Sequence, residues 1–493
     1  MAKKAAAAAT ASVKAFPFGS ATQLARAVRT GAVSSVELLK AYLDRVDRYN
    51  PALNAVVVDD RLRALKDAKA ADRALAAGKP IGPLHGVPMT VKESFNIPGQ
   101  QTTWGFAFLK GNIAKEDAVA VARLRAAGAI VFGKTNVPMA LADLQSFNDV
   151  YGTTNNPWDL ARGPGGSSGG SAAALAAGLN GLEFGSDIGG SIRNPAAYCG
   201  VYGHKPTFGI VPKRGQTTSE LLVAEGDISV IGPMARAAED LALALKVTAG
   251  PDSLAAAGLK LTLPAPPTSL KGLRIAVWLD EPAISPVDAT VCAQIEMAAT
   301  ALRRAGAKVD YDARPDFDVP SAHDTYMRLL LGLMSVGRPD YAEMVARAES
   351  LAGDNSSYAQ SLRYSTASHN DFAIAENRRD LLRWAWNAFF KDYDVLLAPI
   401  TITPAFPHDH SEPMAARTVP VNGIEVPYFS QVFWAGLAIA SYLPSTVAPV
   451  GKAPSGLPVG MQIIGDAYTD RTTIWVAGEL AKLIGGFSPP PGY

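Results

Sequence analysis

The 493-residue chain lacks several features that would assign it to a protein class at once. It has only two cysteines, Cys199 and Cys292, which excludes the multi-disulfide framework of small secreted domains. Its 46 basic and 45 acidic residues leave a formal net charge of +1, so the basic stripe expected of a nucleic-acid-binding protein is missing. No run of about 18 uncharged apolar residues argues for a membrane-spanning helix. These absences favour a neutral protein of the reducing cytoplasm.

Repeats and metal-ligand patterns are missing as well. No repeat of about 20–50 residues is visible, and no cluster of His and Cys has ligand spacing, so neither a metal nor an organic cofactor is expected. The composition, 48% hydrophobic and 18% charged, is ordinary for a large globular protein. The first residues, 1–16, are rich in alanine and are predicted to be a disordered tail, with a targeting segment as the open alternative.

Helical periodicity alternates with short apolar runs along the rest of the chain. The predicted helices lie at 19–46 (two helices, the second beginning at Ser34-Ser35-Val36-Glu37), 60–77, Val119–Ala127 and Ala293–Ala305, and the predicted strands at Ala129–Phe132, Arg274–Trp278 and Lys308–Asp310. This alternation predicts an α/β architecture with helices on both faces of a sheet. The proline-rich stretch Leu263–Pro267 is the predicted linker between a catalytic half and a second half of the same fold.

The segment Gly163–Gly203 is the most informative part of the sequence. It reads GPGGSSGGSAAALAAGLNGLEFGSDIGGSIRNPAAYCGVYG, with two glycine–serine clusters around a helix predicted at Ala172–Ala177. Glycine-rich turns expose successive backbone N–H groups, which can bind a developing negative charge. A serine in such a turn becomes a nucleophile when a base lies close.

Two short motifs suggest other chemistry. Gly128–Thr135 fits the phosphate-binding pattern G-x-x-x-x-G-K-[ST] of nucleotide-binding proteins, but the residues inside the pattern are themselves a predicted strand, and Pro138 disfavours a helix at the lysine. Gly165–Gly169 fits the nucleophile-elbow pattern G-x-S-x-G, but the preceding residues do not form a strand and no later histidine belongs to a motif.

A third interpretation pairs the serines with a lysine. Lys92 ends the apolar run Val87–Val91, where burial would lower its pKa and let it act as a base near neutral pH. No serine stands three residues before a lysine, so the S-x-x-K arrangement is absent and the base must come from elsewhere in the sequence. From the residues alone, all three interpretations stay open.

Taken together, the motifs resemble the amidase signature family of serine hydrolases from about Phe18 to Leu483. The resemblance is carried by GGSSGGSAAALAAG, GSDIGGSIRNPAAYCGVYGHKPTFG, HGVPMTVKESF, GKTNVP, YGTTNNPWD and GLPVGMQIIG. It implies an α/β amidase signature fold, a large mixed, twisted sheet covered by helices on both faces. One domain would span 17–487, with a catalytic core at about 81–247 and a variable, substrate-shaping region at about 250–427.

The resemblance also implies the site residues. Ser191 would be the nucleophile, Ser167, held after a cis peptide, the proton relay, and Lys92 the base, with Ser168 as the competitor for the relay role. The implied oxyanion hole consists of the backbone N–H groups of Ile188, Gly189, Gly190 and Ser191. Asp187 and Arg193 would brace the turn as an ion pair. The apolar residues of LADLQ, with Leu141, Leu144 and Gln145, would line the substrate pocket.

The implied function is hydrolysis of a carboxylic amide, an anilide or a carbamate through an acyl-enzyme, with side activity on esters. The expected partner is a small-molecule amide rather than nucleic acid or a membrane, and a homodimer is left open. The main alternative is the catalytic subunit of a tRNA-dependent amidotransferase. His204 and an extended loop at Val211–Ala235 favour a free-standing hydrolase. Which amide is cleaved stays open.

Overall fold

The computed structural model describes residues 16–219 and 224–493. The tail predicted for 1–16 therefore lies outside the described residues, apart from Phe16, which packs half-buried against the main core. None of the described helices is both long enough and apolar enough to cross a membrane.

The predicted α/β fold is confirmed by a mixed sheet of eight strands. In spatial order the strands are β10 (Lys308–Asp310), β9 (Arg274–Val277), β11 (Val395–Pro399), β15 (Pro458–Ile464), β14 (Ser445–Lys452), β7 (Tyr202–Lys205), β8 (Val230–Ala235) and β6 (Glu183–Asp187). β10, β9 and β11 run parallel, and the remaining neighbours pair antiparallel. Strands from before and after Leu263–Pro267 thus share one sheet, joined through β14 and β15.

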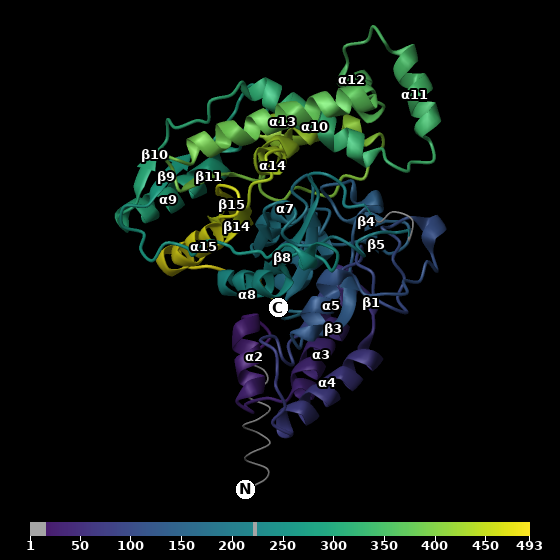
Figure 1. The fold of residues 1–493 in the computed structure, drawn as a ribbon, viewed down its shortest axis with the longest axis vertical. Coiled ribbons are helices and arrows are strands. Elements are labelled where there is room, and N and C mark those ends of the chain that lie inside the picture. The colour runs from purple at the N-terminus through teal and green to yellow at the C-terminus, as the bar shows by residue number, and fades with distance from the viewer. Residues whose placement is uncertain (1–15, 220–223) are drawn as a thin grey trace.

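Helices cover both faces of this sheet (Figure 1). Two groups contact its strands: α6 (Gly169–Ala176) with α7 (Arg193–Cys199), and α15 (Asp470–Ile484) with α8 (Ala238–Thr248) and α9 (Ala289–Arg304). Apart from the edge strand β10 and the end of β14, the strands are buried along almost their whole length, which is expected when both faces of a sheet are covered. The largest hydrophobic core cluster combines residues from Ala21 to Leu480.

A second, three-stranded sheet lies beside the first. Its order is β1 (Val56–Asp59), β3 (Ile130–Thr135) and β2 (Pro88–Lys92), and β2 and β3 run parallel. The helices of the N-terminal part are α2 (Ala21–Arg29), α3 (Ser35–Leu53), α4 (Arg61–Ala76) and α5 (Val119–Ala126). β2 contacts β6 of the large sheet, so the end of β2 lies next to the glycine–serine clusters.

The region after Leu263–Pro267 adds a group of helices at one end of the molecule (Figure 1). They are α10 (Val319–Met334), α11 (Tyr341–Ser350), α12 (Ser357–Ser365), α13 (His369–Phe389) and α14 (Val432–Ile439). Two hairpins, β4 (Phe147–Asn148) with β5 (Gly152–Thr153) and β12 (Thr418–Val421) with β13 (Ile424–Pro427), complete the strands. The 3₁₀ helices are Ala107–Leu109, Met139–Leu141, Ala255–Ala257, Met414–Ala416 and Tyr428–Gln431.

Local capping explains why α2 and α3 were predictable. Ser34 caps α3 through the backbone N–H of Glu37, and the Glu37 carboxylate accepts in return from the Ser34 N–H. This reciprocal capping box satisfies two backbone donors at the helix start. The helix predicted for 60–77 is confirmed as α4.

Several predicted boundaries are wrong, among them the end of α3, which continues beyond residue 46 to Leu53. The extended loop expected at Val211–Ala235 contains β8, because Val230–Ala235 pairs with both β6 and β7. β3 continues beyond Phe132 to Thr135, where the pairing with β2 extends it. α9 begins at Ala289 rather than Ala293, because the Asp288 side chain caps it through the N–H of Thr290.

Candidate active site

Lys92 ends strand β2 inside the protein, with no part of the residue exposed. Its Nζ donates hydrogen bonds to Ser167 Oγ at 2.6 Å and to Ser186 Oγ at 3.0 Å. Burial lowers the pKa of Lys92 to about 7, and the charges of Asp187, Glu183 and Glu93 oppose this shift only in part. The amine is therefore available in its neutral form near neutral pH.

The first glycine–serine cluster forms a tightly packed turn. The Gly166–Ser167 peptide bond is cis, as the family resemblance implied. A Cβ atom on Gly165 would lie 2.6 Å from Asn194 Oδ1, and one on Gly166 would lie 2.3 Å from the Asp143 carbonyl oxygen. Both positions therefore require glycine. This close packing fixes the Ser167 hydroxyl against Lys92.

Ser168, the competing relay candidate, has different contacts. Its hydroxyl donates to the Ser186 carbonyl oxygen at 3.4 Å. Its backbone N–H donates to the Ser191 carbonyl oxygen at 3.0 Å, which joins the two clusters. Only Ser167 of the first cluster is hydrogen-bonded to Lys92 within the part of the chain that the structure describes.

The second cluster connects β6 to α7. Asp187, the last residue of β6, forms an ion pair with Arg193, with Arg193 Nε 3.0 Å from Asp187 Oδ2 and neither side chain exposed. Burial alone would raise the pKa of Asp187, but the Arg193 guanidinium outweighs it and the pKa is lowered. The predicted brace is therefore present, and its buried charges are paired.

The Asp187 carboxylate also accepts backbone N–H groups of the turn. Gly190 donates to Oδ1 at 2.9 Å and Ile192 to Oδ2 at 3.1 Å. The Gly190 N–H is therefore already engaged in this structure, and its part in the oxyanion hole stays a prediction. Within residues 16–219 and 224–493, the N–H groups of Ile188, Gly189 and Ser191 have no acceptor. These three donors could bind an anion.

Ser191 stands at the end of this turn and is 5% exposed. The structure thus brings Lys92 and Ser167 into direct contact, and the backbone hydrogen bond from Ser168 to Ser191 joins the second cluster to the first.

Two of the predicted substrate-pocket residues are buried. Leu144 is 6% exposed and belongs to the main core. The Gln145 side chain is buried, donates from Nε2 to the Asp409 carbonyl oxygen at 2.6 Å and accepts from the Asp409 N–H at 2.9 Å. Packing and a paired amide thus engage both side chains, and their contact with substrate stays a prediction. Leu141 is half-buried, with a left-handed φ of 59°.

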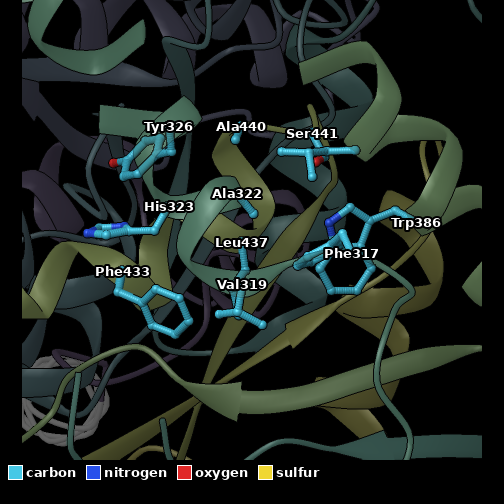
Figure 2. Close-up of a pocket in the computed structure, with 12 residues that line it drawn as sticks. Phe317, Val319, Ala322, His323, Tyr326, Trp386, Phe433, Leu437, Ala440 and Ser441 are labelled. Atoms are coloured by element: carbon cyan, nitrogen blue, oxygen red, sulfur yellow. The ribbon is translucent and has the colours of Figure 1, made fainter. Parts of the chain in front are cut away.

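Instead, an apolar pocket lies between α10, α13 and α14 (Figure 2). Its lining includes Phe317, His323, Tyr326, Trp386 and Phe433. It encloses about 20 Å³, which is room for one water molecule. Sequence reasoning missed these residues, because they belong to no motif and come from helices far apart along the chain.

The phosphate-binding interpretation of Gly128–Thr135 is wrong. All of it but the first two residues is strand β3, and no helix starts at Lys134. Lys134 is buried, and its Nζ donates to the Gln101 carbonyl oxygen at 2.7 Å, to Thr102 Oγ1 at 2.9 Å and to the Glu93 carbonyl oxygen at 3.3 Å. No backbone N–H cradle can form within a paired strand.

His204, the histidine considered as an alternative base, belongs to a separate buried network. Its ring nitrogens contact Asp470 Oδ1 at 3.1 Å and Thr446 Oγ1 at 2.9 Å. Burial lowers the pKa of His204, while Asp470 raises it in part. Both ring nitrogens are therefore engaged away from the glycine–serine clusters.

The chain is similar to known proteins along almost its whole length. Residues 37–474 match the family described as Amidase. The chain is 35% identical to the indoleacetamide hydrolase of Bradyrhizobium diazoefficiens, covering 94% of this chain and 86% of that protein. It is 32% identical to a protein of a Synechococcus species that is named as one of the subunits of glutamyl-tRNA(Gln) amidotransferase, covering 94% and 96%. The solved structure of a bacterial aryl acylamidase of the amidase signature family superposes with a TM-score of 0.80 at 27% identity, covering 95% and 96%.

Proposed function

Because the chain belongs to the amidase family of hydrolases that act on carbon–nitrogen bonds, we propose that it cleaves a carboxylic amide through an acyl-enzyme on Ser191. The observation that supports this proposal most directly is the 2.6 Å contact between Lys92 Nζ and Ser167 Oγ. A buried lysine with a pKa of about 7 can take a proton at neutral pH. A serine hydroxyl both accepts and donates, so Ser167 can pass a proton between Ser191 and Lys92.

In the first half-reaction, Ser191 Oγ attacks the amide carbonyl carbon. Its proton passes to Ser167, and the Ser167 proton passes to neutral Lys92. The negative charge that forms on the carbonyl oxygen is held by the N–H groups of Ile188, Gly189 and Ser191; one such donor contributes about 3–4 kcal/mol in other hydrolases. The intermediate then collapses, and the leaving amine takes a proton from Ser167, which recovers one from Lys92.

The second half-reaction releases the acid. Water attacks the acyl-enzyme carbonyl and gives its proton to the same relay. Collapse of this intermediate breaks the bond to Ser191 Oγ, which is reprotonated through Ser167. The products are a carboxylic acid and an amine or ammonia, and the relay returns to its starting protonation state.

The names of the relatives favour amides with an aromatic part. One relative is called an indoleacetamide hydrolase, and one structural neighbour an aryl acylamidase. We extend this to the present chain as an arylalkyl amide or an anilide, with carbamates and esters as further candidate substrates.

A second candidate function is that of one chain of an amidotransferase, because a relative with nearly full-length coverage carries that name. Such a chain would require partner chains, and the ammonia it releases would be passed on. Hydrolysis of simple amides by the purified chain alone would favour the free-standing enzyme. Activity that appears only with glutamine and added partner chains would favour the transferase.

A serine-directed fluorophosphonate probe tests the nucleophile. The adduct is expected on Ser191, and peptide mapping of the labelled protein locates it. Ser191→Ala should abolish labelling, while Ser168→Ala should retain it. An adduct on Ser167 or Ser168 in the unaltered protein would move the nucleophile to the first cluster and refute the proposal.

A further inference from the structure

The loop at residues 143–146 (the bracing loop) holds the turn Gly165–Gly169 (the relay turn), which carries Ser167. The Ser146 hydroxyl donates to the carbonyl oxygen of the first residue of this turn at 3.0 Å and accepts from the N–H of its last residue at 3.1 Å. Ser146 is only 1% exposed, so its hydroxyl is shielded from competing water. A single side chain therefore fixes the relay turn on both sides of Ser167.

The backbone of the bracing loop also packs against the residue that precedes Ser167. A Cβ atom on Gly166 would lie 2.3 Å from the Asp143 carbonyl oxygen and 2.6 Å from that of Gln145. The two backbones are therefore in direct contact, without a side chain between them. Closely packed interiors transmit displacements rather than absorb them. A shift of the bracing loop would therefore move Gly166 and, with it, the Ser167 hydroxyl.

The carboxylate of Asp143 anchors the bracing loop. Arg417 Nη1 donates to Asp143 Oδ2 at 2.6 Å, and the Tyr428 hydroxyl donates to Asp143 Oδ1 at 2.6 Å. The Arg417 side chain has no exposed surface and that of Asp143 is 8% exposed, so the ion pair is buried. The same carboxylate accepts from the Gln145 N–H at 3.1 Å, which fixes the conformation of the loop itself. Hydrogen bonds to a charged group are the stronger ones, so this anchor is rigid.

A second anchor comes from the same distant part of the chain. The Gln145 amide pairs with both backbone groups of Asp409. Arg417 also donates from Nε to the Ser411 carbonyl oxygen at 2.7 Å, which ties the two anchors together. Both belong to residues 409–428, the segment that contains the β12–β13 hairpin. This segment therefore reaches the relay turn only through the bracing loop.

We propose that Asp143 is a positioning residue, which fixes the Ser167 hydroxyl for the proton relay through the bracing loop. This inference rests on the proposed function, because the relay is a step of that mechanism. Ser167 has to take a proton from Ser191 and give one to the leaving amine, and both transfers need short, aligned hydrogen bonds. A displacement of about 1 Å in such a group costs about 100-fold in rate. Loss of Asp143 should therefore lower kcat rather than raise KM.

The leaving group separates a displaced relay from a general loss of structure. Acylation by phenylacetamide needs Ser167 twice, whereas p-nitrophenyl phenylacetate, which has the same acyl group, needs it once, because p-nitrophenolate leaves as a stable anion. Asp143→Asn should lower kcat on phenylacetamide by about tenfold to a hundredfold, with KM changed by less than about twofold. The loss in kcat/KM should be at least about fivefold smaller for the ester than for the amide.

Two further variants keep the test decisive if Asp143→Asn does not fold, since that variant leaves Arg417 buried without its charge partner. Ser146→Ala removes only the hydroxyl that joins the two ends of the relay turn, and it should lower kcat on phenylacetamide by about tenfold. Tyr428→Phe removes one donor to the Asp143 carboxylate and should lower kcat by about threefold. All activities are referred to the folded fraction, measured by denaturant unfolding.

Asp394→Asn is the matched control. Its carboxylate also pairs with an arginine, Arg274, at 2.7 Å, but this pair lies beside β9 and β11, near the opposite end of the large sheet from β6. No change in kcat is expected. Equal losses with the amide and the ester in Ser146→Ala would overturn the proposal, because the loop would then only support the fold. An unchanged kcat with a raised KM would overturn it as well, because the loop would then contact the substrate.

The rate of fluorophosphonate labelling separates this inference from the proposed function. Labelling requires the relay to take the Ser191 proton but requires no amide. If the unaltered protein is labelled on Ser191 and hydrolyses no amide, the proposed function fails. Slower labelling of Ser146→Ala would then still support the positioning role, and an unchanged labelling rate would refute it. Amide hydrolysis that is unaltered in both Ser146→Ala and Asp143→Asn would refute the positioning role and leave the function standing.

Discussion

Two lysines at the ends of neighbouring strands show how similar burial leads to different roles. Lys92 ends β2 and Lys134 lies near the end of β3, and neither has any exposed surface. Burial lowers the pKa of Lys92 to about 7 and that of Lys134 to about 8. From burial and pKa alone, either lysine could serve as a base.

The strand register separates them. Lys134 pairs with Val91 and Lys92 pairs with Thr135, and side chains alternate faces along a strand, so the two lysines point to opposite faces of the small sheet. Lys92 reaches two serine hydroxyls, whereas Lys134 reaches two backbone carbonyl oxygens and a threonine hydroxyl. Carbonyl oxygens only accept hydrogen bonds, while a hydroxyl can pass a proton on, and the hydroxyl of the glycine–serine cluster is a partner of Lys92. The partners, rather than the pKa, distinguish a proton acceptor from a structural cation.

The strongest test of this comparison removes each lysine in turn. Lys92→Ala should lower kcat on phenylacetamide by about 10³-fold or more, the range expected for loss of a general base. Lys134→Ala should retain kcat in molecules that stay folded. It should instead lower the free energy of unfolding by about 3 kcal/mol, because its buried acceptors lose their donor.

Initial rates and denaturant unfolding, measured on both variants, show which lysine is the base and which one stabilises the fold. Loss of turnover in Lys134→Ala at full stability, together with an active Lys92→Ala, would reverse the assignment. Loss of turnover in His204→Ala with Lys92→Ala still active would transfer the role of base to the histidine network.

The buried ion pair of Arg193 and Asp187 gives the next comparison, because here the partner of a buried cation is a carboxylate. Asp187→Asn should lower the free energy of unfolding by about 3–5 kcal/mol, because it leaves the Arg193 guanidinium buried without its charge partner. Replacement of both residues by a neutral pair, in Asp187→Asn with Arg193→Met, should restore part of this loss. Equilibrium unfolding in urea measures both, and a single-variant loss below about 1 kcal/mol would show that the turn does not depend on the pair.

The pH dependence of activity sharpens the distinction further. The base must be neutral, so kcat/KM should rise through the Lys92 pKa of about 7 and then level off. At pH 5 it should be about 100-fold below the plateau. Asp187, Glu183 and Glu93 carry the charges that act on Lys92. Burial raises the pKa of Glu183 to about 7, the same as that of Lys92, so Glu183→Gln serves as the control that separates the two titrations. A profile without inflection between pH 6 and about 8 would contradict a lysine base of this burial.

The same shifts predict the sign of a stability change. Folding lowers the pKa of Lys92 from 10.5 to about 7, so between these pH values the unfolded chain binds more protons than the folded one. Stability from this group therefore rises with pH across that window. Lys134 acts in the same direction between about 8 and 10.5. Lys92→Met should flatten the rise in the free energy of unfolding between pH 7 and about 10.

The smallest expected effect concerns Tyr326, which holds the turn from the far helical region. Tyr326→Phe removes only the hydroxyl that donates to the Ile188 carbonyl oxygen. Loss of one such bond, about 1 kcal/mol, should lower kcat about fivefold with little change in KM. An unchanged kcat with a raised KM would mean that Tyr326 contacts substrate but does not position the turn.

Much of the fold was readable from local signals. Periodicity and capping predicted α3, because Ser34 and Glu37 satisfy backbone donors within one helical turn. α4 was predicted as well, although no side chain caps it. The glycine–serine clusters predicted two tight turns around a helix, and α6 lies between them. The contact between Lys92 and Ser167 was implied only by the family resemblance. No local pattern could predict it, because 75 residues separate the two in the chain.

Other features could not be predicted because they depend on distant partners. Gln145 looked like a pocket residue, yet its amide pairs with Asp409, which lies 264 residues away. Gly190 looked like an oxyanion donor, yet its N–H is taken by Asp187 across the turn. No local pattern encodes which acceptor such a donor meets.

The sequence by itself determined the residue types that the chemistry needs: a lysine at the end of an apolar run, serines in glycine-rich turns, and an acid and an arginine at either end of the second turn. These follow from local backbone requirements, which a few neighbouring residues satisfy. The tertiary structure decided which lysine meets a hydroxyl, which N–H groups stay without an acceptor, and which aromatic side chains border the turn. Those outcomes depend on the register of β2 against β3 and on the packing of α10 and α14 against residues 188–190. Contacts between elements far apart in the chain exist only once the core has formed.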